Sequence, residues 1–175
     1  SLLFRLFRRF WFGDRSLNFF LQHMRFERMV SPAGDLQGLP PRFAAVKFYT
    51  GPAIPDTPDR RRVLRGLVSR VADEMPVVVL DTGLSLDDHR DFLFEGTPNV
   101  IHLPERLTPA TNLAAQTRVI AGASLFLGTC GSLAWLAPML GTPTIGVYAD
   151  DRFLVPHLFV AKHAYRLMDA ALFTT

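Results

Sequence analysis

The hydrophobic pattern of the chain changes character near residue 42. Beyond that point, short and continuously apolar runs recur, each too short for a helix and too uniformly apolar for a strand with one solvent-facing side. Such runs are typical of strands buried on both faces of a sheet. They cover residues 43–50, 76–83, 99–104, 124–129 and 143–149.

Amphipathic stretches separate the apolar runs. The helical spacing of their apolar residues predicts helices over residues 57–75, 108–123, 132–140 and 152–168. Thr57 is a candidate N-cap and Pro58 a first-turn proline. The expected inward faces are Val63, Leu64, Leu67, Val68 and Val71 in the first helix, with its arginines outward, and Leu113, Ala114, Thr117, Ile120 and Ala121 in the second.

Strand and helix alternate along residues 42–175, which predicts an α/β fold. Parallel strands joined by right-handed helical crossovers form a doubly wound sheet, here of about five strands with helices on both faces. Ligands of such sheets bind beyond the carboxyl ends of the strands. Those ends fall at residues 49–51, 81–83, 102–104, 128–132 and 148–151.

Residues 1–41 follow a different pattern. Apolar residues with interspersed arginines in residues 1–12 and 16–30 predict two amphipathic helices, and residues 31–42 form a Pro- and Gly-rich linker. The chain begins with Ser1 and not with Met, so we expect residues 1–41 to be the end of an upstream domain and residues 42–175 to be the compact unit. The helices either pack on another domain or lie on an anionic membrane surface.

The composition fits a globular domain. The chain has 175 residues, 49% of them hydrophobic and 20% charged, with a net charge of +3 that is concentrated in two arginine-rich segments. One cysteine excludes an internal disulfide, and no apolar stretch is long enough for a membrane span. We therefore expect a cytoplasmic protein.

A polar corner after the fourth apolar run is the best candidate binding site. Gly128 and Gly131 free the backbone, and the helix that follows directs unpaired N–H groups and a positive dipole end at the gap, which suits a phosphate. Ser132 is expected to cap that helix and Gly141 to end it. The alternative is a tight turn with glycines for steric reasons alone. Neither G-x-x-x-x-G-K-[ST] nor G-x-G-x-x-G after the first strand occurs.

Residues 107–150 resemble a known family. The order of a helix, "ASLFLG", a polar corner, "LAPMLGTPT" and an apolar strand is similar to the nucleotide-sugar-binding half of glycosyltransferases with the two-domain B-type fold, above all the bacterial heptosyltransferase-like group. Cys130, Gly131 and Ser132 stand where that group has D-T-G. The resemblance implies a Rossmann-like donor domain over residues 42–175.

The resemblance also implies a set of residues that bind the nucleotide sugar. Phosphate would contact backbone N–H and hydroxyl groups of the corner, while the other strand ends offer small or hydroxyl-bearing residues and an acid. Each side chain also has an ordinary interpretation: a lysine that snorkels from an edge strand, a loop histidine, an aspartate that caps the next helix. The set is Lys47, Thr50, Thr82, Gly83, His102, Leu103, Thr129, Gly131, Ser132 and Asp150.

The implied activity is transfer of a sugar from a nucleotide diphosphate to an acceptor hydroxyl, in surface polysaccharide or glycoconjugate synthesis. The catalytic base would belong to the missing upstream domain, so the isolated chain should be nearly inactive. We expect no metal, no cofactor and no nucleic-acid partner. The alternatives are a nucleotide-sugar 2-epimerase, a polysaccharide pyruvyl transferase and a non-catalytic interaction module. A nucleophilic Cys130 and a metal site in residues 87–91 are weaker hypotheses.

Overall fold

The computed structural model describes residues 22, 27–32, 34, 36–81, 83, 89–103, 108–152, 154–168 and 172–175. Almost all of the two expected N-terminal helices, Thr82, Asp87 and Asp88 lie outside the described residues. The proposed division at residue 42 therefore stays a prediction. Within the described residues, no helix is both long and apolar enough to cross a bilayer.

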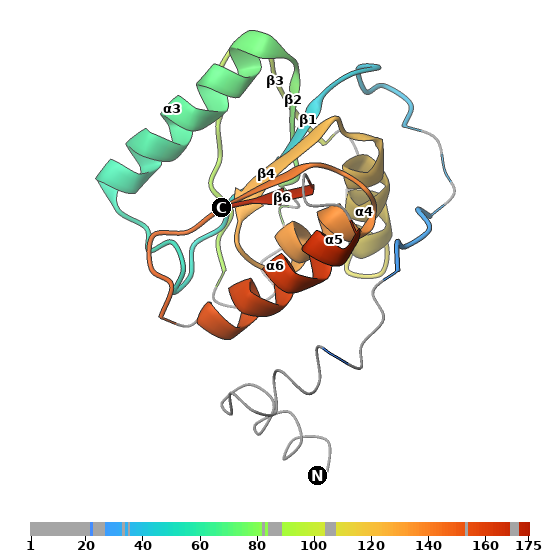
Figure 1. Cartoon of the computed structure of the whole chain (residues 1–175). Helices are drawn as coiled ribbons and strands as arrows, with labels where there is room; N and C mark the ends of the chain where they lie inside the picture. Colours follow the sequence, from blue (N-terminus) through green and yellow to red (C-terminus); the bar gives the residue numbers. More distant parts are fainter. Residues whose placement is uncertain are drawn as a thin grey trace.

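A single parallel sheet of six strands organises the chain (Figure 1). The strand order is β3-β2-β1-β4-β5-β6, and every neighbouring pair is parallel. The five predicted strands are confirmed, and the sixth has only two residues, too few to leave a hydrophobic pattern. The strands are β1 (Ala44–Lys47), β2 (Val77–Val79), β3 (Val100–His102), β4 (Leu125–Thr129), β5 (Thr144–Val147) and β6 (Phe173–Thr174).

Four helices of the described residues flank the sheet, so the fold is a Rossmann-like doubly wound α/β fold, as predicted. In Figure 1, α3 covers one face of the sheet, and α4, α5 and α6 lie on the other. The described part of the β2–β3 connection, residues 89–99, contains no helix. The helices are α3 (Pro58–Glu74), α4 (Asn112–Gly122), α5 (Ser132–Met139) and α6 (Val155–Met168).

The sheet separates two apolar cores because successive side chains of a strand point to opposite faces. Ala44 and Val46 of β1 pack on the α3 side, with Leu64, Val68 and Ala72 of that helix. Phe43 and Ala45 pack on the other side, in a cluster with residues of α4 and α5. A third cluster joins α6 to Trp135 and Phe173.

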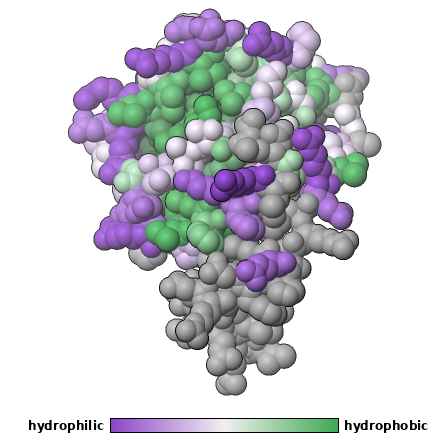
Figure 2. All heavy atoms as spheres, in the orientation of Figure 1, coloured by the Kyte–Doolittle hydropathy of each residue, from purple (hydrophilic) through white to green (hydrophobic). Residues whose placement is uncertain are grey.

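The inward face of α3 is narrower than predicted. Leu64 and Val68 are buried, but Val63 is 68% exposed. Since each residue of a helix is rotated about 100° from the last, a stripe at i, i+4 and i+8 leaves position i−1 facing solvent. The arginines lie outward as expected, and Figure 2 shows hydrophilic residues along the outer edge where α3 runs.

The inward face of α4 is also shifted from the prediction. Leu113 and Ala114 are exposed, whereas Thr117 and Ile120 are buried. The helix begins only at Asn112, so its first turn lies beyond the edge of the packed region. The predicted face is therefore right at Thr117 and Ile120 and wrong in the first turn.

Three of the four expected helix-end signals are confirmed. The Thr57 hydroxyl accepts a hydrogen bond from the Arg60 N–H at 3.3 Å, with Pro58 in the first turn of α3. Gly141, with φ +85°, follows the end of α5 in the left-handed conformation that glycine adopts without strain. The expected Ser132 cap is wrong, because Gly131 is the N-cap and Ser132 is already helical.

Candidate functional site

The polar corner lies where the strand order of the sheet reverses. From β1 the chain proceeds through β2 to β3, then returns to the other side of β1 to form β4. Lys47, the last residue of β1, pairs in register with Gly128 of β4. Beyond the carboxyl ends of β1 and β4, the chain crosses over opposite faces of the sheet. Doubly wound sheets bind ligands at this position.

Both corner glycines are closely packed, Gly128 against backbone and Gly131 against the end of a side chain. A Cβ on Gly128 would lie 2.5 Å from the Lys47 carbonyl oxygen, and one on Gly131 would lie 1.7 Å from the Tyr49 hydroxyl oxygen. The steric explanation of the glycines is therefore sufficient for their presence. The Tyr49 ring, which also packs edge-on against His89, stands beside the corner.

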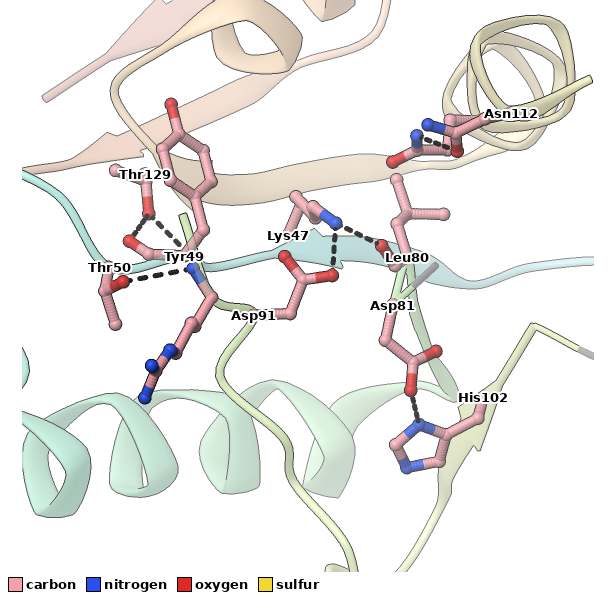
Figure 3. A network of polar contacts seen from close by, with 11 residues as sticks. Lys47, Tyr49, Thr50, Leu80, Asp81, Asp91, His102, Asn112 and Thr129 are labelled. Atoms are coloured by element: carbon pink, nitrogen blue, oxygen red, sulfur yellow. Dashed lines mark hydrogen bonds and ion pairs between the residues drawn. The ribbon is translucent and has the colours of Figure 1, made fainter. Parts of the chain in front are cut away.

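Thr129 belongs to the interior of the corner. Its side chain is buried, and its hydroxyl accepts the Tyr49 N–H at 3.1 Å and lies 3.3 Å from the Tyr49 carbonyl oxygen, to which it donates (Figure 3). The hydroxyl that we expected to face phosphate is thus engaged within the fold. Its structural effect is to fix the backbone of Tyr49 against β4.

The start of α5 presents the amides that the corner was expected to offer. The Cys130 N–H is bonded to Val147, and the first intrahelical bond runs from the Trp135 N–H to the Gly131 carbonyl. Residues 132–134 come before that first bond, and no acceptor in the described part of the chain pairs with their N–H groups. Ser132 is exposed, so its amide and hydroxyl are the most accessible donors of the corner.

Trp135 does not cover the corner. Its indole ring stacks on His157, with ring centroids 6.4 Å apart, and contacts Phe173. The Tyr165 hydroxyl donates to the Trp135 carbonyl oxygen at 2.5 Å. The indole therefore belongs to the cluster between α5, α6 and β6, and the ring that stands beside the N-cap of α5 is that of Tyr49.

Cys130 is a packing residue. It is 2% exposed, and desolvation raises the pKa of its thiol to about 12. The thiol is therefore protonated at neutral pH, whereas a nucleophilic cysteine must be a thiolate. The hypothesis of a cysteine nucleophile is wrong for this arrangement.

Lys47 is directed past the end of the sheet. Its strand is interior and not an edge strand, so the alternative of snorkelling from an edge is wrong. The ammonium lies 2.6 Å from an Asp91 carboxylate oxygen and 2.8 Å from the Leu80 carbonyl oxygen, with the side chain 12% exposed (Figure 3). Sequence reasoning missed Asp91 because it lies in a connection 44 residues away.

Asp81 and His102 form a second pair at the same edge. Asp81 lies two residues after β2 and His102 is the last residue of the neighbouring β3, and Nδ1 of His102 lies 2.8 Å from an Asp81 carboxylate oxygen (Figure 3). With an Nδ1–H donated to the carboxylate, Nε2 remains an acceptor in the neutral ring. The sequence did contain a signal for this pair. Neighbouring parallel strands end at the same edge of a sheet, so residues at their carboxyl ends lie side by side.

The remaining predicted residues are dispersed around this edge. Asp150 is paired with Arg152, whose hydrogen bonds lower the pKa of Asp150 to about 2, and its carboxylate accepts the Arg152 N–H at 3.0 Å in a local turn. Thr50 points to the α3 side, away from Tyr49. Leu103 packs on the core beneath α4 and α5, and Gly83 is exposed with φ +60°.

The site is an open polar edge without a preformed metal centre in the part of the chain that the structure describes. No group of three histidine, cysteine, aspartate or glutamate side chains converges among those residues. The groups that this edge could offer a ligand are therefore neutral backbone amides, a lysine–aspartate pair and an aspartate–histidine pair. Neither a scan against protein-family models nor a search of the curated proteins finds a match to this chain.

Proposed function

We propose that this chain is the donor-binding half of a glycosyltransferase and holds a nucleotide-diphosphate sugar at the polar corner. One observation carries the proposal: the open N-terminus of α5 lies at the point where strand order reverses between β1 and β4. Amides and a helix dipole aimed at such a crevice favour a diphosphate, and they favour it more as charge develops on the leaving group.

Each residue then has a defined task. The amides and hydroxyl at Ser132 bind phosphate oxygens, and Lys47 supplies positive charge by exchanging its contact with Asp91 for the diphosphate. His102 and Leu103 border the nucleoside, and Asp150 accepts hydrogen bonds from sugar hydroxyls. The base that takes the proton from the acceptor hydroxyl comes from a separate domain. This chain therefore binds the donor but does not transfer its sugar rapidly.

Calorimetric titration with UDP, GDP and ADP tests donor binding. Ser132→Glu places a carboxylate in the first turn of α5, where it favours the helix but repels phosphate, so we expect binding to weaken at least about tenfold. The matched control is Ser124→Glu, an exposed serine just before the opposite end of β4. Equal binding by the two variants, or no nucleotide binding by the unmodified chain, contradicts the proposal.

The cellular setting follows from the same proposal. A donor domain of this type would serve surface polysaccharide or glycoconjugate synthesis in the cytoplasm, peripheral to the inner face of the membrane, with a glycan or other hydroxyl acceptor. Cell fractionation with and without residues 1–26 tests the membrane contact. Retention in the membrane fraction that is independent of this segment contradicts it.

A nucleotide-sugar 2-epimerase is the second candidate. The observation that favours it is the Asp81–His102 pair, because an oriented imidazole can accept a proton from a sugar carbon. Incubation with UDP-N-acetylglucosamine in D₂O distinguishes the two functions. An epimerase incorporates deuterium at C2 and loses this activity in Asp81→Asn, whereas a donor domain leaves the sugar unlabelled.

A further inference from the structure

A second polar concavity lies on the opposite face of the sheet, under the first two turns of α3. It is a cavity of about 310 Å³ between that helix and residues 90–95. Phe92 and Phe94, both almost fully buried, form an apolar floor. Three arginines line it: Arg61 and Arg65, one helical turn apart on α3, and Arg90.

The segment that carries Arg90 is anchored to the end of β1. The Thr50 N–H donates to the Arg90 carbonyl oxygen at 2.8 Å, and the Arg90 N–H donates to the Thr50 hydroxyl at 3.1 Å. The Phe92 N–H donates to the Phe48 carbonyl oxygen at 2.9 Å. These bonds hold the backbone of the cavity wall in register with the sheet, so Arg90 projects from a fixed position.

The charges around the cavity are unequally matched. Asp56 forms a two-pronged ion pair with Arg61, at 2.6 and 2.5 Å, and the hydrogen bond from Arg61 is the main reason that the pKa of Asp56 lies below its usual value. The carboxylate of Asp91 is held by Lys47, which lies outside the cavity lining. Two of the three lining carboxylates are thereby neutralised.

Arg65 and Arg90 keep most of their donor capacity. Arg65 donates to the neutral carbonyl oxygen of Glu95 at 3.3 Å, and within the described residues neither arginine forms an ion pair with a carboxylate. The exposed carboxylate of Glu95 is the third acid of the lining. Arg65 and Arg90 therefore line the cavity together with the exposed Glu95, and Arg90 also interacts electrostatically with Asp56.

We propose that this cavity binds a small organic phosphomonoester, with its phosphate between Arg65 and Arg90 and its organic body over Phe92 and Phe94. Guanidinium forks match phosphate geometry and bind it through paired, charge-assisted hydrogen bonds. A volume of about 310 Å³ admits a molecule of the size of a sugar phosphate. The cavity and the corner lie on different sides of the end of β1, because Thr50 lines the cavity whereas Tyr49 stands beside the corner, and the Lys47–Asp91 pair lies between them.

Calorimetric titration of the full chain with glucose 6-phosphate tests the proposal, with glucose and inorganic phosphate as matched ligands. We expect Arg65→Gln and Arg90→Gln each to weaken binding of glucose 6-phosphate by roughly tenfold, and Glu95→Gln to strengthen it. Arg62→Gln is the control, since Arg62 lies on the same helix, pairs with Asp59 and does not line the cavity.

The other outcomes are equally informative. Inorganic phosphate that binds as tightly as glucose 6-phosphate overturns the role of the apolar floor, and glucose that binds equally well overturns the role of the arginines. Binding that survives Arg65→Gln and Arg90→Gln but is lost in Ser132→Glu places the phosphate at the corner and refutes the second site. Absence of binding at millimolar concentration also refutes it, without bearing on nucleotide binding at the corner.

Discussion

The bond between Thr129 and the backbone of Tyr49 illustrates the limits of reading single residues. A threonine beside a strand-to-helix turn has the chemistry to contact phosphate, and the sequence alone favours that role. The structure turns the hydroxyl inward, where it bonds to both the N–H and the carbonyl of Tyr49. The direction of a side chain at a strand end depends on which strand lies beside it, and that information is long-range.

Cys130 gives a prediction at the same scale. Because burial raises the pKa of its thiol to about 12, iodoacetamide at pH 8 should leave the folded chain unmodified and alkylate it rapidly in 6 M urea. The unfolded thiol ionises near its ordinary value of 9.0, so the thiol contributes stability below that pH and loses it as the pH rises toward 12.

Mass spectrometry after timed quenching measures the modification of Cys130. A Cys130→Ala variant serves as the control for labelling at other nucleophiles. Alkylation of the folded chain at the rate seen in urea would show that the thiol is accessible, contrary to the burial described.

At the scale of elements, local signals specified the frame of the fold. Continuous apolar runs identified five strands, and Thr57, Pro58 and Gly141 marked helix ends correctly, because these signals act through neighbouring residues. The two-residue β6 left no signal, and Ser132 was misplaced by one position at the start of α5. Boundaries and faces depend on packing against other elements, which periodicity does not contain.

The face of α3 yields a paired prediction. Leu64→Ala should lower the free energy of unfolding by about 2–5 kcal/mol, because it removes a side chain that is 3% exposed from the core against β1 and β2. Val63→Ala, one position earlier and 68% exposed, should change it by less than about 0.5 kcal/mol. Urea denaturation followed by circular dichroism measures both. Equal destabilisation would mean that α3 is rotated from the described orientation.

At the scale of the whole molecule, the site is assembled from segments that the sequence keeps far apart. Lys47 meets Asp91 and Asp81 meets His102 only because parallel strands end at one edge and the β2–β3 connection folds back along β1. The sequence sufficed to predict that these strand ends share one edge of a parallel sheet. It could not predict the pairs, because they depend on strand order, which hydrophobic pattern leaves open.

The Lys47–Asp91 pair gives a prediction about this assembly. Lys47→Met or Asp91→Asn should each destabilise the fold by about 1–3 kcal/mol, since each breaks the ion pair between two partly buried charges. The double variant should be more stable than the sum of the single effects predicts. Urea denaturation of all four proteins gives the coupling energy, and strictly additive effects would show that the pair contributes nothing to holding residues 89–94 in place.

The consecutive residues Tyr49 and Thr50 face opposite sides of the sheet, one toward the corner and the other toward the arginine-lined cavity. Inserting or deleting one residue between Lys47 and Thr50 would exchange these directions and reverse every contact that the end of β1 makes. This short stretch should therefore be intolerant of changes in length, whatever side chains it carries. An insertion directly after the exposed Pro55, before the Asp56–Arg61 pair and the Thr57 cap, should cause far less disturbance.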